Sequence, residues 1–76
     1  MNKPFGVICY DHPEIPHTEE VLFEDEAAMN AHLTESLNGG FDVNHVWAFV
    51  PTAEVAERLA AVAVSLTGLR PPMYKI

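Results

Sequence analysis

Apolar positions along the chain follow a period of two in some segments and a period of 3.6 in others. The run Phe5–Tyr10 is continuously apolar, and Glu20–Phe23 alternates between polar and apolar residues. Val43–Val50 also alternates, is rich in β-branched and aromatic residues, and is followed by Pro51. These patterns predict three strands, of which the first two form a hairpin across a proline-containing loop at 11–18.

The helical period appears in two segments, and each begins after a residue that can cap a helix. Asp25 precedes a segment that runs to Leu37, and Thr52 precedes one that runs to Leu66. Glycines follow both segments, as is typical of helix ends. The predicted buried stripes are Met29, Leu33 and Leu37 in the first helix, and Val55, Leu59, Val62 and Leu66 in the second.

The order of elements is therefore strand, strand, helix, strand, helix, and the tail 69–76 leaves room for a short terminal edge strand. Residues 1–76 form one domain, because a chain of this length cannot supply two cores. We expect an α+β fold with a three- to four-stranded, mainly antiparallel sheet and both helices on one face. A ferredoxin-like, split βαβ arrangement is one specific candidate.

Alternation along the third predicted strand separates its side chains into two faces. One face carries Val43, His45, Trp47 and Phe49, and the other carries Asn44, Val46, Ala48 and Val50. We expect the helices to cover the second, smaller face, which leaves an aromatic patch for a homodimer or for another protein. The alternative is that the helices cover the aromatic face.

Charge along the chain is unusually one-sided. The net charge is −7, and all eleven acids lie between Lys3 and Arg58, an interval without Lys or Arg. Direct binding to nucleic acid or to an anionic membrane is therefore not expected, since both need a basic patch. A basic partner fits this distribution, and the alternative is an acidic surface that serves only solubility.

Residue types that could carry chemistry gather early in the chain: Cys9, Asp11, His12, Glu14 and His17, with His45 further on. Structural zinc sites usually contain two ligand pairs, and only Cys9-x-x-His12 has ligand-like spacing. A Cys–His catalytic pair needs a positive neighbour to lower the thiol pKa, and this segment is acidic. Neither a metal nor a cofactor is predicted.

Cysteine content and hydropathy bear on where the chain resides. Cys9 is the one cysteine, so no intramolecular disulfide can form. No run of 18 apolar residues is present, and the first residues lack the apolar segment of a signal peptide. A cytoplasmic location is the expectation.

These features together predict a non-enzymatic protein-binding module, in which an acidic edge meets a basic surface and an aromatic face anchors the partner. The acidic edge comprises Asp11, Glu14, Glu19, Glu20, Glu24, Asp25, Glu26 and Glu35, and the anchor comprises His45, Trp47 and Phe49.

In size and charge the chain resembles small anti-defence proteins of bacteriophages, including some anti-CRISPR proteins. That resemblance implies an inhibitor that occupies the nucleic-acid-binding surface of its target. Two other classes stay open. One is a small dimeric α+β barrel enzyme or ligand-binding protein with a sheet-face pocket around His45 and Trp47, where His45 would act as a general base. The other is a structural subunit whose acidity has no specific role.

Overall fold

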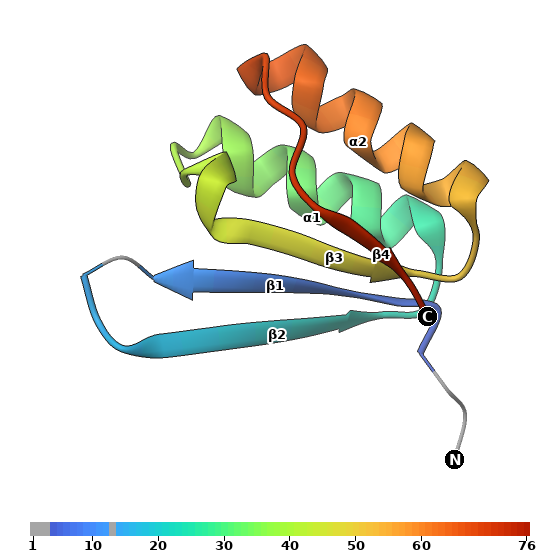
Figure 1. Cartoon of the computed structure of the whole chain (residues 1–76), viewed down its shortest axis with the longest axis horizontal. Helices are drawn as coiled ribbons and strands as arrows, with labels where there is room; N and C mark the ends of the chain where they lie inside the picture. Colours follow the sequence, from blue (N-terminus) through green and yellow to red (C-terminus); the bar gives the residue numbers. More distant parts are fainter. Residues whose placement is uncertain (1–3, 13) are drawn as a thin grey trace.

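A computed structural model describes residues 4–12 and 14–76 and shows a layer of helices packed on one face of a sheet (Figure 1). The elements are β1 (Gly6–His12), β2 (His17–Phe23), α1 (Glu26–Asn38), a 3₁₀ turn (Val43–His45), β3 (Val46–Val50), α2 (Ala53–Thr67) and β4 (Met73–Lys75). The predicted α+β architecture is confirmed, including the short terminal strand. Lys3, which bounds the acidic interval, and residue 13 of the predicted hairpin loop lie outside the described residues.

The sheet has the strand order β2-β1-β3-β4. Strand β1 pairs antiparallel with both β2 and β3, whereas β4 pairs parallel with β3. Helix α2 connects β3 to β4, so these three elements form a βαβ unit whose two strands are direct neighbours. A split βαβ unit would place another strand between them, and the sheet differs from the ferredoxin-like candidate in this respect.

The hairpin of β1 and β2 extends further than the sequence pattern predicted. Pairing continues through Asp11 with Thr18 and through His12 with His17. The two histidine rings stack with their centroids 5.7 Å apart. A ladder of backbone hydrogen bonds does not require apolar side chains, so it continues into the polar segment until the turn. The predicted loop at 11–18 is therefore too long at both ends.

The segment Val43–His45 is a 3₁₀ turn and not the start of the third strand. The Asp42 carboxylate accepts a hydrogen bond from the backbone N–H of Asn44 at 2.9 Å, which stabilises a turn in place of an extended chain. Val43 consequently points into the core, where it is 5% exposed. The alternation that placed Val43 and His45 on the aromatic face does not apply before residue 46.

Both helices begin as predicted. The Asp25 carboxylate accepts from the N–H of Ala28 at 2.8 Å, and the Thr52 hydroxyl accepts from the N–H of Val55 at 3.2 Å. In α1 the predicted stripe of Met29, Leu33 and Leu37 is buried.

The buried face of α2 is rotated relative to the prediction. Its buried residues are Val55, Leu59, Ala60 and Ala63. The small side chains of Ala60 and Ala63 allow close packing on that side, and periodicity computed from large residues alone overlooks them. Val62 and Leu66 instead line an open, mainly apolar groove of about 310 Å³ with Thr34 of α1.

Candidate functional site

Alternating side chains give the sheet a face under the helices and a face turned away from them, here named the outer face. Ile8, Tyr10, Val46, Ala48 and Val50 lie under the helices and are at most 3% exposed. The expectation that the helices cover the smaller face of β3 is therefore confirmed. The apolar residues of the outer face are Val7, Cys9, Leu22, Trp47, Phe49 and Tyr74.

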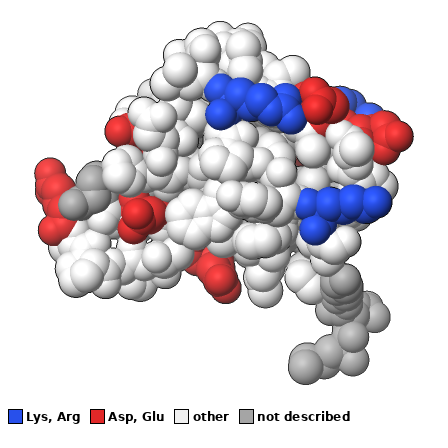
Figure 2. Space-filling model, viewed as in Figure 1, with Lys and Arg blue, Asp and Glu red and all other residues white. Residues whose placement is uncertain are grey.

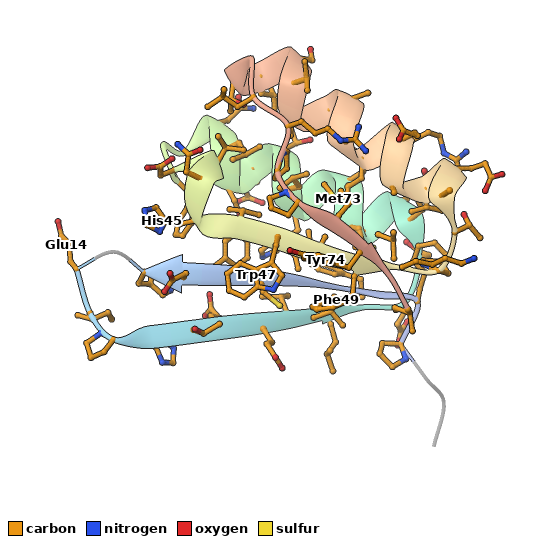
Figure 3. The ribbon with its side chains drawn as sticks, viewed as in Figure 1. Glu14, His45, Trp47, Phe49, Met73 and Tyr74 are labelled. Atoms are coloured by element: carbon orange, nitrogen blue, oxygen red, sulfur yellow. The ribbon has the colours of Figure 1, made fainter. Side chains whose placement is uncertain are left out.

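The aromatic residues of the outer face, here named the aromatic row, are Trp47 and Phe49 of β3 and Tyr74 of the neighbouring strand β4. Trp47 and Phe49 project from β3 away from the helices (Figure 3). Phe49 pairs with Tyr74 of β4, and their ring centroids are 5.4 Å apart. Tyr74 is 50% exposed and Leu22 is 63% exposed, while Trp47 and Phe49 are half-buried. Within the described residues, no element covers this face.

Cys9 lies on the outer face but is only 2% exposed, since its neighbours in the register are the larger residues Trp47 and Glu20. Burial raises the pKa of the Cys9 thiol, and the charge of Glu20 raises it further. The thiol is therefore disfavoured as a nucleophile. His12 is three residues along the same strand, so its side chain lies on the opposite face.

The metal-ligand types noted in the sequence do not converge. In residues 4–12 and 14–76, no group of three His, Cys, Asp or Glu side chains is arranged to hold a metal ion.

His45, at the end of the 3₁₀ turn, lies between two carboxylates. Its Nδ1 is 3.7 Å from Asp11 of β1, and its Nε2 is 3.9 Å from Asp42. The side chain is about one-third exposed. It directly precedes β3, near the end of the sheet that carries the β1–β2 turn (Figure 3).

Two acidic side chains, Glu26 of the predicted edge and Glu57 of α2, form ion pairs with arginines of the same chain. Arg58 of α2 donates two hydrogen bonds of 2.7 Å to the carboxylate of Glu26, and these hold the pKa of Glu26 below its usual value. Arg70 binds Glu57 in the same bidentate way, at 3.0 and 3.2 Å. The other nine acids form no ion pair with a Lys or Arg of the described residues.

The predicted acidic residues are spread over the hairpin, the connection between β2 and α1, and helix α1. Glu19 and Glu20 follow each other on β2, an edge strand, so they lie on opposite faces of the sheet. Glu14 lies at the hairpin turn, Glu24 and Asp25 lie between β2 and α1, and Glu35 is exposed on α1. At the hairpin end, on the left in Figure 2, acidic side chains are visible without any basic one.

A polar pocket on the helix side of the hairpin was not found from the sequence. It has a volume of about 190 Å³ and is lined by Tyr10, His12, Glu19, His32, Ser36 and Phe41. The Tyr10 hydroxyl lies 2.7 Å from Nδ1 of His32 and 2.9 Å from Oγ of Ser36. Neither this pocket nor the groove between the helices includes His45 or Trp47.

One signal for this pocket is present in the sequence. His32 and Ser36 are four residues apart on a predicted helix, and Tyr10 and His12 are two apart on the first hairpin strand. Each pair therefore shares a face. The missing information is which helix face meets which strand.

Comparison of the chain with protein-family models, with curated proteins and with solved structures found no match. Along the described residues, no helix has both the length and the apolar character needed to cross a bilayer.

Proposed function

We propose that this chain is a non-enzymatic protein-binding module whose outer face docks on a basic surface of another protein. The observation that carries the proposal is the aromatic row on the face turned away from the helices, where Tyr74 is 50% exposed and Trp47 and Phe49 are half-buried. Aromatic side chains bury a large area at a small entropic cost and are the usual anchors of protein interfaces.

Charge complementarity supports a basic partner. Asp11 and Glu20 border the aromatic row, and neither contacts a Lys or Arg of the described chain. Lys75 alternates with Tyr74 and so lies on the opposite face of β4. Lysine or arginine side chains on a partner would satisfy these carboxylates and accelerate association.

The same charge argues against the other occupants of this face. A second copy also carries a net charge of −7, so a sheet-to-sheet homodimer would bring like charges together. Nucleic acid is repelled for the same reason. One form of the proposal is an inhibitor that covers the nucleic-acid-binding surface of its target, since such surfaces are basic.

The test is partner capture with matched variants of exposed apolar residues. Leu22→Ser and Tyr74→Ser change the outer face, whereas Leu69→Ser changes a residue of similar exposure (49%) just after α2. The partner is identified by capture from the native host, and its affinity is then measured with purified proteins at two salt concentrations. We expect a loss of about tenfold for each outer-face variant and steep weakening with salt, with Leu69→Ser unchanged.

Two results would overturn the proposal. One is equal affinity of all three variants for the partner, which would place the interface elsewhere. The other is a concentration-dependent dimer in sedimentation that Tyr74→Ser abolishes, because the outer face would then be occupied by a second copy of the chain.

A further inference from the structure

The polar pocket differs from the outer face in being a small, open depression lined by both polar and aromatic side chains. Its volume of about 190 Å³ lies below the roughly 300–1,000 Å³ of ordinary small-molecule sites, so it fits the end of a single side chain or a fragment of that size. β1, β2, α1 and the segment between α1 and the 3₁₀ turn all contribute to its walls.

Aromatic rings form part of the pocket wall at right angles to each other. Phe41 meets the ring of Tyr10 edge to face, with centroids 5.0 Å apart and planes at 75°. It meets His12 in the same manner, at 5.6 Å and 84°. Aromatic side chains therefore make up part of the lining, and a cation within about 6 Å of a ring face is attracted to it.

The charge on the pocket wall is negative. Glu19 pairs with Tyr10 across the hairpin; burial raises the pKa of the Tyr10 hydroxyl, and the charge of Glu19 adds to this effect. No Lys or Arg is among the lining residues, and Glu19 contacts none in the described chain. An anion would therefore meet a carboxylate, whereas a cation would find an unmatched one.

Acceptor oxygens accompany this carboxylate. With Ser36 donating to the Tyr10 oxygen and the Tyr10 hydroxyl donating to Nδ1 of His32, the lone pairs of the Ser36 oxygen remain available. An alkylammonium group has three N–H donors and a narrow apolar stem, which match one carboxylate, one hydroxyl oxygen and aromatic walls.

From this geometry we propose that the pocket binds the alkylammonium group of a lysine side chain on the partner protein. This inference rests on the proposed function, because it names the partner residue that enters the acidic hairpin end. Glu19 supplies the counter-charge, Ser36 accepts a hydrogen bond, and Tyr10, His12 and Phe41 enclose the stem.

The test uses the full chain and a defined probe, without the partner. The probe is lysine with its α-amino and carboxyl groups blocked as amides, titrated into the chain and followed by NMR of the aromatic side chains. We expect saturable shifts at Tyr10, His12 and Phe41, with a dissociation constant of about millimolar order for so small a ligand. The same compound with its side-chain nitrogen acetylated carries no charge and is expected not to bind.

Adjacent glutamates provide a matched pair of variants. Glu19→Gln and Glu20→Gln change the net charge equally, but only Glu19 lines the pocket. We expect Glu19→Gln to weaken probe binding about tenfold, whereas Glu20→Gln leaves it within about twofold. Equal weakening by both variants would overturn the proposed binding site, because the overall negative charge of the chain would then account for binding of the probe. Tighter binding of free butane-1,4-diamine than of the lysine probe would overturn lysine as the source.

The two proposals can fail separately. Partner affinity that falls with Leu22→Ser but not with Glu19→Gln leaves the protein-binding module standing and removes the lysine pocket. The opposite outcome is saturable binding of the probe that depends on Glu19, together with partner affinity that Leu22→Ser and Tyr74→Ser do not change. That outcome keeps the lysine pocket and removes the outer face as the docking surface.

Discussion

The hydroxyl of Tyr10 lies 2.7 Å from Nδ1 of His32, which links β1 to α1 inside the polar pocket. Tyr10 is 3% exposed, so its polar end needs a partner, and Ser36 provides a second one at 2.9 Å. The ring of His32 also packs edge to face against Phe23, the last residue of β2. One histidine thus connects helix α1 to both strands of the hairpin.

Removing this hydroxyl is expected to destabilise the fold modestly. Tyr10→Phe keeps the buried ring and deletes both hydrogen bonds, so we expect a loss of about 1 kcal/mol in the free energy of unfolding, measured by urea denaturation. Tyr74→Phe is the control, because Tyr74 is half exposed and its hydroxyl can bond to water. Equal stabilities of the two variants would show that the Tyr10 network contributes nothing.

The same residue is expected to make stability fall at high pH. Burial raises the pKa of the Tyr10 hydroxyl above its ordinary value of 10.0, so the folded state favours the protonated form. Its contribution to stability is therefore complete below pH 10 and is lost as the pH rises through the higher folded-state pKa. Urea midpoints compared between pH 9 and pH 11 should fall less for Tyr10→Phe than for the unchanged chain.

Reactivity of Cys9 provides a measure of how well the outer face is packed. Because burial raises its pKa and Trp47 flanks it, the thiol should react with Ellman's reagent much more slowly in the folded chain than in urea. Trp47→Ala should accelerate the reaction by uncovering the sulfur. Fast labelling of the unchanged chain, as fast as in urea, would contradict this packing.

Local signals in the sequence were enough to predict most of the elements. Asp25 and Thr52 cap the helices as expected, because capping depends only on residues within one turn. The turn at Val43–His45 was missed, since the competing hydrogen bond from Asp42 overrides an alternating pattern that otherwise looks like a strand.

Contacts between distant residues explain the rest of what was missed. Arg58 and Glu26 are 32 residues apart, and no periodicity indicates that they face each other. The acidic residues could therefore be counted from the sequence but not sorted into bound and unbound ones. The outer aromatic face was predictable for the opposite reason, because alternation within β3 alone assigns Trp47 and Phe49 to one side.

Gly6 on β1 is required by its neighbours. A Cβ at this position would collide with the end of the Met29 side chain and lie 3.0 Å from the backbone oxygen of Phe49. We expect Gly6→Ala to cost about 1–3 kcal/mol in urea denaturation. The double variant Gly6→Ala with Met29→Ala should be more stable than the sum of the single losses predicts, and strict additivity would show that Met29 is not the obstacle.

The ion pair between Glu26 and Arg58 should give stability a specific dependence on acid. Because the two hydrogen bonds from Arg58 lower the pKa of Glu26, the pair contributes fully above the ordinary pKa of 4.5 and less as the pH falls through the lower folded-state value. We therefore expect Glu26→Gln to lower the urea midpoint at pH 7 and to match the unchanged chain at strongly acidic pH.

Glu57→Gln is the matched control, since Glu57 also binds an arginine but is 70% exposed where Glu26 is 31% exposed. Greater exposure means stronger screening by water, so removing Glu57 should change the midpoint less. Salt distinguishes the two pairs again, because the effect of Glu26→Gln should persist better at high ionic strength. If Glu57→Gln were the more destabilising variant at pH 7, the connection between α1 and α2 would not depend on this ion pair.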